Sequence, residues 1–233
     1  MRGYIRQDSA YRMRPKFLIE EIAGVPFLVL CCGKTDGRWR TRQLRRALHY
    51  MAEQGTRQAI MPTQLAPLCR EMGIQSISEA PLRLALAEPI LERFCVQNGL
   101  DIHRSAVRVR AYEADYAVQR LAILLASKAR YVELQVSTGA EELGDWLRRE
   151  YGLSAGNCGR NPVMQICCGT IGDEDIPTLW FGKNCEKYQQ VCYQLPPLWQ
   201  EWTGADPQLL SVLFDEGKLP VEEVGIKSVE SNA

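Results

Sequence analysis

The chain has 233 residues, and 46% of them are hydrophobic, so it can bury the core of one large domain or two small ones. A mostly disordered protein is therefore excluded. No run approaches the roughly 18 uninterrupted apolar residues of a membrane-spanning helix, and no apolar stretch follows the first basic residues as it does in a signal peptide. We expect a cytoplasmic protein with no membrane segment.

The formal net charge is zero, but charge is divided unevenly along the chain. Residues 1–110 hold 18 Lys and Arg against 10 Asp and Glu, whereas residues 111–233 hold 10 against 18. Such a division is typical of a basic surface for nucleic acid or anionic ligands, or of two lobes that attract each other, and we favour the second interpretation.

The cysteines indicate a reducing compartment. There are nine, an odd number, and two pairs are sequence neighbours, Cys31-Cys32 and Cys167-Cys168, which are poorly placed for a regular disulfide framework. No Cys-x-x-Cys occurs and the chain has only two histidines, so no linear zinc motif is present. We predict no metal site from a linear motif.

The first half is predicted to begin with an arm and a hairpin. Residues 1–16 carry five basic side chains among few large apolar ones, which predicts an unpaired surface segment. The apolar runs 17–19 and 27–30 are separated by turn-forming residues around Gly24, which predicts a hairpin leading into a buried strand.

Helices and short strands follow. Apolar residues recur at i, i+3, i+4 and i+7 from Leu44 to Met51, which predicts an amphipathic helix over 39–54 that ends at Gly55. The pattern further predicts a strand over 57–61, a helix over 64–72, and a helix over 81–98 interrupted at Pro89.

In the second half strands and helices alternate. We predict strands over 107–111, 131–136 and 163–168 and helices over 115–128 and 140–151, the last with a capping box formed by Thr138 and Glu141. This order predicts an α/β fold with a mostly parallel sheet, flanking helices and two Rossmann-like βαβ halves.

We divide the chain into three parts on this pattern. Residues 1–104 are predicted to form an N-terminal α/β lobe, and residues 105–195 a second, Rossmann-like lobe. Residues 196–233 are predicted to be a C-terminal segment that docks on the body through a short helix, with Asp206 as its N-cap and Pro207 at its first position.

A candidate anion site follows the first buried strand. Gly33, Lys34 and Thr35 match the end of a phosphate-binding P-loop, but Leu28 stands where that loop needs its first glycine. A looser site remains, because free amides at the start of a helix favour an anion. The alternative is that Asp36 supplies the counter-charge internally. The candidate ligand-binding residues are Gly33, Lys34, Thr35, Arg38 and Arg40.

Residues 107–136 form a strand, a helix and a second strand, and in order and length they resemble Rossmann-type nicotinamide-binding domains. Those domains carry a Gly-x-Gly-x-x-Gly turn where this chain has Ala111-Tyr112-Glu113-Ala114-Asp115-Tyr116. The bulky side chains would block a pyrophosphate, and the carboxylates would repel it. NAD(P) is therefore possible as a cofactor but disfavoured, and no other cofactor is predicted.

Two cysteines are candidates for catalysis. Cys32 and Cys168 each end a predicted strand, and the carboxyl ends of neighbouring parallel strands line the ligand crevice of a sheet. We expect the two strand ends to lie side by side in one sheet, where a thiolate could act as a nucleophile. The alternative is that both cysteines pack as small apolar residues.

These observations give three hypotheses. The first is a degenerate Rossmann-like protein that binds a small anionic ligand or a protein partner without catalysis. The second is an NAD(P)-dependent or thiol-based oxidoreductase. The third, a nucleic-acid-associated protein, is disfavoured and rests on the basic first half alone.

Overall fold

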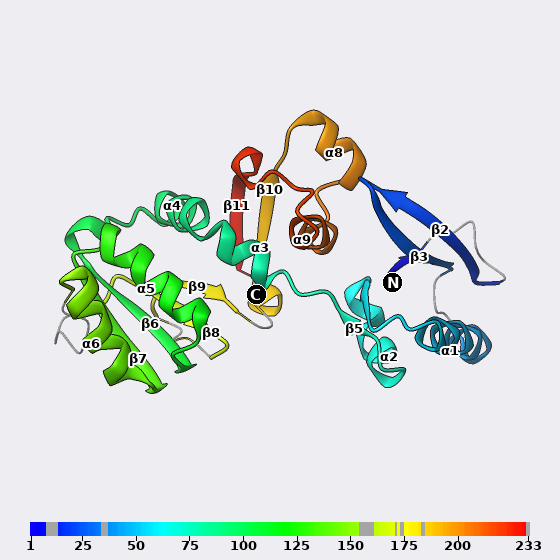
Figure 1. Cartoon of the computed structure of the whole chain (residues 1–233), viewed down its shortest axis with the longest axis horizontal. Coiled ribbons are helices and arrows are strands. Elements are labelled where there is room, and N and C mark those ends of the chain that lie inside the picture. Colours follow the sequence, from blue (N-terminus) through cyan, green and yellow to red (C-terminus); the bar gives the residue numbers. More distant parts are fainter. Residues whose placement is uncertain are drawn as a thin grey trace. The chain divides into compact units, whose positions relative to one another are not determined.

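The computed structural model describes residues 1–7, 14–33, 37–153, 161–170, 172, 175–182 and 185–231. Its contacts divide the chain into two compact units (Figure 1). The first consists of Met1–Ser78 with Glu201–Leu219, and the second of Glu79–Gln200 with Pro220–Ala233. The division falls before residue 80 rather than at 104/105, because the two helices that follow Ser78 pack on strands of the second unit.

The first unit is built on a five-stranded sheet with the order β2-β3-β1-β4-β5. Its strands are β1 (Arg2–Gln7), β2 (Lys16–Ile22), β3 (Val25–Cys32), β4 (Gln58–Ile60) and β5 (Gln75–Ser76). β1 pairs in parallel with both β3 and β4, and β4 pairs in parallel with β5. β2 is antiparallel to β3, so the predicted hairpin is confirmed.

The predicted surface arm is wrong for residues 2–7, which form β1 at the centre of this sheet. Its alternate residues Gly3 and Ile5 are buried, and only one of them is a large apolar residue, so the alternating hydrophobic pattern of a strand is too weak to detect in the sequence. Residues 8–13 of the predicted arm lie outside the described part of the chain.

Helices complete the first unit. The predicted amphipathic helix is confirmed as α1 (Arg38–Glu53), with Leu44, Ala47, Leu48 and Met51 buried. A short 3-10 helix η1 (Thr63–Leu65) leads into α2 (Ala66–Glu71), and both contribute to the core formed by α1 and the sheet.

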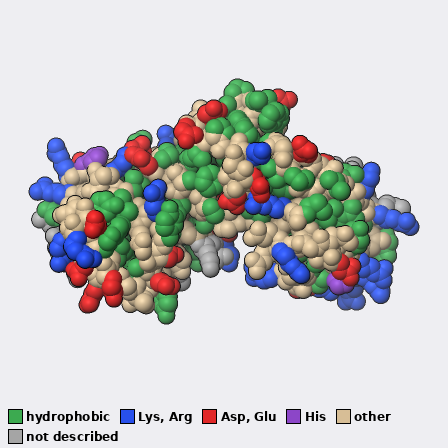
Figure 2. Space-filling model, viewed as in Figure 1, with side chains coloured by type: hydrophobic (Ala, Val, Ile, Leu, Met, Phe, Trp, Pro, Cys, Tyr) green, Lys and Arg blue, Asp and Glu red, His purple; other side chains and the backbone are tan. Residues whose placement is uncertain are grey.

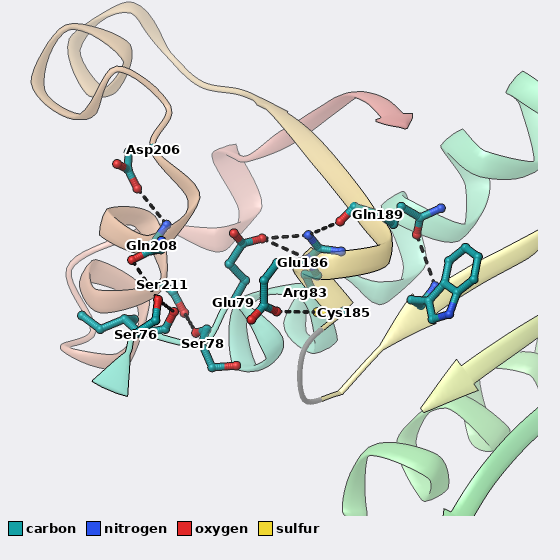
Figure 3. A network of polar contacts seen from close by, with 12 residues as sticks. Ser76, Ser78, Glu79, Arg83, Cys185, Glu186, Gln189, Asp206, Gln208 and Ser211 are labelled. Carbon is teal, nitrogen blue, oxygen red and sulfur yellow. Dashed lines mark hydrogen bonds and ion pairs between the residues drawn. The ribbon is translucent and has the colours of Figure 1, made fainter. Parts of the chain in front are cut away.

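The predicted C-terminal helix is α9 (Pro207–Asp215), and it docks on the first unit. Asp206 caps it as expected, accepting hydrogen bonds from the amides of Gln208 and Leu209. The Gln208 side chain bonds both the N–H and the C=O of Met61, at 3.0 and 3.1 Å. Two further bonds of this unit are drawn in Figure 3, from Ser211 Oγ to Ser78 O and from Ser76 Oγ to Gln208 Oε1.

The second unit contains a fully parallel four-stranded sheet with the order β7-β6-β8-β9. Its strands are β6 (Ala106–Glu113), β7 (Tyr131–Thr138), β8 (Met164–Cys168) and β9 (Thr178–Phe181). The predicted helices α5 (Tyr116–Lys128) and α6 (Ala140–Tyr151) contact β6 and β7. The predicted α/β fold with parallel sheets flanked by helices is therefore confirmed.

A two-stranded antiparallel ribbon and several helices complete this unit. The ribbon consists of β10 (Gln189–Gln194) and β11 (Gly225–Ser231). The helical elements are α3 (Ala80–Ala85), α4 (Ala87–Asn98), η2 (Ile102–Arg104), α7 (Cys185–Tyr188) and η3 (Val221–Glu223), and α8 (Pro197–Thr203) spans the division between the units.

Three local predictions were wrong. The helix predicted over 81–98 breaks at Leu86 rather than at Pro89. Pro89 lies in the first turn of α4, where its missing N–H costs no hydrogen bond because the N–H groups of a first turn have no partner within the helix. The N-cap of α6 is Gly139 without a side-chain bond, so the Thr138 capping box does not form. The cysteine-rich strands β3 and β8 belong to two different sheets, so the single sheet rim shared by Cys32 and Cys168 does not exist.

Within the described residues, no helix combines the length and hydrophobicity needed to cross a membrane.

The placement of β1 can be tested at Gly3. A Cβ there would lie 2.6 Å from Met51 Cε, 2.8 Å from Thr56 Cγ2 and 2.9 Å from Ala59 Cβ. Gly3→Ala should therefore lower the free energy of unfolding by about 1–3 kcal/mol through overpacking, measured by urea denaturation.

Gly225→Ala is the matched control. Gly3 is the second residue of β1, and Gly225 is the first residue of β11, where an added Cβ would meet Gln194 at an ordinary 3.6 Å. Equal stability of the two variants would show that residues 2–7 do not occupy the sheet.

Candidate functional site

The predicted anion site lies where β3 leads into α1. Gly33 is half-buried after the strand, and Arg38 and Arg40 are exposed in the first turn of the helix. Gly37 is the N-cap, with a φ of 107° that favours glycine, and it supplies no side-chain bond. The first turn carries no acidic residue. Lys34, Thr35 and Asp36 lie outside the described residues, so both the ligand set and its proposed internal counter-charge stay predictions.

The arginines of α1 continue along the helix as an exposed basic surface, which we call the arginine face. It consists of Arg38, Arg40, Arg42, Arg45 and Arg46. Figure 2 shows blue side chains gathered over α1 at the lower right. Arg45 pairs with Glu71 at 3.0 Å, whereas the other four form no ion pair with another described residue. Trp39, in the same turn as Arg38, is 59% exposed.

The predicted thiol site is divided between the units. Cys32 lies in the core of the first unit beside Cys69, and burial, with a smaller contribution from a neighbouring cysteine, raises the pKa of both thiols to about 11. Cys168, in the second unit, also has a raised pKa, mainly through burial and secondly through Asp115. Each environment favours the thiol over the nucleophilic thiolate. The catalytic roles predicted for Cys32 and Cys168 stay untested.

The carboxyl end of the second sheet is where a Rossmann-type domain would hold its ligand. β7 and β8 flank β6, so the chain departs to opposite sides of β6 at this edge. Asp115 occupies the start of α5, and its Oδ1 accepts a hydrogen bond from Val118 N at 3.0 Å. A pyrophosphate would compete with this carboxylate for the same helix end. The geometry therefore argues against a dinucleotide in the usual pose.

A buried polar cluster in the second unit was not predicted (Figure 3). Arg83 in α3 is 1% exposed. Its Nε and Nη2 donate to Glu79 Oε2 at 3.1 and 2.8 Å, and Nη2 also donates to Gln189 O at 2.8 Å. Burial lowers the pKa of Arg83, but nearby groups, first Cys185 and then Glu79, raise it by more, so the guanidinium stays charged.

The cluster extends to the edge of the sheet through Gln189. The Gln189 side chain is buried and bridges two backbone groups of β9, accepting from Trp180 N at 3.2 Å and donating to Thr178 O at 3.3 Å. Arg83 is thus hydrogen-bonded to Gln189, the residue whose side chain bonds the outer edge of β9. Tyr193 and Cys185 lie in the same cluster, and burial raises the pKa of both, that of Cys185 to about 12.

The sequence gives only a weak signal for this cluster. Glu79 and Arg83 have i, i+4 spacing, which is typical of exposed helical ion pairs. Their burial depends on β10, more than 100 residues later in the chain. Among the described residues, no group of three or more His, Cys, Asp or Glu is arranged to hold a metal ion.

Comparisons with known proteins assign no family. No family model matches the chain, and no curated protein matches it. Nine chains of solved structures match, among them the crystal structure of L-tryptophan dehydrogenase from Nostoc punctiforme, at 12% identity and a TM-score of 0.34. That match covers 70% of this chain and 52% of the dehydrogenase chain, so this chain spans about half the length of the enzyme. A likeness at this level transfers no activity.

Thiol reactivity tests the environment of the cysteines. At pH 8, iodoacetamide should modify Cys32 and Cys69 at least tenfold more slowly than the half-buried Cys192, because a pKa of about 11 leaves little thiolate. The rates for Cys32 and Cys69 should keep rising with pH until about 11, measured by mass spectrometry of the labelled peptides. Labelling in urea is the control, and a Cys32 that reacts fastest in the folded protein would restore it as a nucleophile.

Removing one partner tests the buried ion pair. Arg83→Met leaves the Glu79 carboxylate buried without its cation and should cost about 3–5 kcal/mol of stability in urea unfolding. Adding Glu79→Gln to Arg83→Met should recover part of this loss. The control Arg148→Met removes an exposed pair with Asp145 and should change stability by less than about 1 kcal/mol. Equal effects of Arg83→Met and Arg148→Met would contradict the buried pair.

Proposed function

We propose that this chain is a non-catalytic binding protein whose arginine face binds an acidic surface of a partner protein. Gly33, Arg38 and Arg40 of the predicted anion site belong to this surface or adjoin it. The binding roles of Lys34 and Thr35, which lie outside the described residues, stay a prediction from the sequence.

The observation that carries the proposal is the spread of unpaired arginines along α1. Arg38 and Arg46 are eight residues apart, which is about 12 Å along a helix. Four of the five arginines have no described acidic partner. A small anion would contact one or two of them, whereas an extended acidic surface would contact Arg38, Arg42, Arg45 and Arg46, which lie on one side of the helix opposite its buried residues.

The residue types favour a protein over a nucleic acid as the partner. Arginine forms two-pronged bonds with carboxylates and phosphates alike, so the preference for a protein rests on the enrichment of arginine and tryptophan at protein interfaces. Trp39 supplies an exposed aromatic side chain beside Arg38 and Arg40.

Two features of the described residues support binding without catalysis. The buried thiols have raised pKa values, which disfavours a cysteine nucleophile. Asp115 occupies the helix end that a nicotinamide dinucleotide would need. Neither the NAD(P)-dependent nor the thiol-based oxidoreductase is favoured by a specific observation.

Charge reversal on α1 tests the proposal with poly-L-glutamate as the acidic probe. The triple variant Arg38→Glu, Arg42→Glu, Arg46→Glu should bind the probe at least about tenfold more weakly, because each exposed ion pair contributes roughly 0.2–1 kcal/mol and each reversal adds repulsion. Binding by the unaltered protein should weaken as salt rises. Isothermal titration calorimetry measures both effects.

The matched control reverses three exposed arginines elsewhere, Arg104→Glu, Arg120→Glu and Arg149→Glu, and so changes the net charge equally. Equal loss in both triple variants would show that net charge alone attracts the probe. Binding of single-stranded DNA without binding of poly-L-glutamate would replace the protein partner with a nucleic acid.

A further inference from the structure

The second unit contains a cavity that no part of the proposed function uses. Its volume is about 490 Å³, which is within the range of small-molecule sites. It lies between α4, the segment before β9, β9 itself and α7, and its walls include Phe94, Asn98, Asp175, Pro177, Trp180 and Tyr188.

Two stacked aromatic rings form one wall of this cavity. The Trp180 and Tyr188 ring centroids lie 5.6 Å apart, and the planes are inclined by only 15°. Tyr188 is 39% exposed, so part of its surface is open to a ligand. Flat rings bind such a surface well, because stacking costs little conformational freedom.

The wall is held in place before any ligand arrives. The Trp180 amide and the Thr178 carbonyl are both bonded to the buried Gln189 side chain, and the backbone carbonyl of Gln189 accepts a hydrogen bond from Arg83. Thr178 Oγ1 also accepts from Gln165 at 2.8 Å and donates to Ile176 O at 2.7 Å. A preorganised wall loses little entropy on binding.

The charge of the cavity selects the kind of ligand. Asp175 is the charged side chain among the described lining residues, and it forms no ion pair with another described residue. No described lining residue is a lysine or an arginine. A carboxylate beside aromatic faces repels anions and attracts cations, since the faces of Trp and Tyr rings are themselves negative.

We propose that this cavity binds a small planar organic cation, with its ring stacked on Tyr188 and its positive charge toward Asp175. This site is independent of the arginine face, which would attract anions. Loss of one activity therefore leaves the other measurable.

Calorimetry with N-methylquinolinium tests the site. The intact chain should bind this cation at concentrations up to about 1 mM, and should bind quinoline-4-carboxylate, a flat anion of similar size, at least tenfold more weakly. Tyr188→Ala should weaken binding of the cation about tenfold through loss of stacking. Asp175→Asn should weaken binding of the cation several-fold while binding of uncharged quinoline stays the same.

The controls are Tyr151→Ala and Asp145→Asn, which change an exposed tyrosine and an exposed aspartate outside the cavity. Both should bind the cation as the unaltered chain does. The proposal is overturned if the cation fails to bind, if the anion binds equally well, or if Tyr188→Ala and Tyr151→Ala bind alike. Binding of poly-L-glutamate by Tyr188→Ala should be unchanged, which separates failure of this site from failure of the arginine face.

Discussion

The buried guanidinium of Arg83 is the constraint on which the second unit depends. A charge with 1% exposure must be paired and hydrogen-bonded, because leaving it alone in a low-dielectric interior would cost several kcal/mol. Glu79 supplies the opposite charge from the N-cap of the same helix, and Gln189 supplies a carbonyl from the start of β10. α3 and the β10–β11 ribbon are therefore joined by a contact whose loss would destabilise the second unit.

The same contact reaches the edge of the parallel sheet. The backbone carbonyl of Gln189 accepts a hydrogen bond from Arg83. The side chain of Gln189 bonds the Trp180 N–H and the Thr178 C=O of β9, as a neighbouring strand would. β9 carries Trp180, and Trp180 forms the stacked wall of the cavity with Tyr188. A polar interaction in the core is thus linked through Gln189 to the aromatic wall of the cavity.

The sequence predicted most elements of the fold because their signals are local. The spacing of Leu44, Ala47, Leu48 and Met51 is enough to define α1, and alternating strands and helices are enough to indicate parallel sheets. β1 was missed because its buried positions include Gly3, whose lack of a side chain is what the packing against Met51 and Ala59 requires. A glycine chosen for close packing gives no hydrophobic signal.

The sites were harder to predict because they depend on contacts between distant segments. Two similar Cys-Cys-Gly strand ends suggested one rim, yet β3 and β8 belong to separate sheets. In the sequence Arg83 looks like an ordinary exposed arginine, because its contact with Gln189 of β10 is more than 100 residues away. The lining of the cavity likewise comes from distant segments, such as those of Phe94 and Tyr188. Of the arginine face, the sequence indicated Arg38 and Arg40 as part of an anion site, and all five arginines lie within one predicted helix or at its start.

Hydrogen exchange at the Trp180 backbone amide tests the central role of Arg83 most directly. This amide donates to Gln189, so its protection reports whether Gln189 is held in place. The account predicts that Arg83→Met greatly reduces protection at Trp180 while amides of β3 in the first unit, such as Leu30, keep theirs. Unchanged protection at Trp180 in that variant would contradict it.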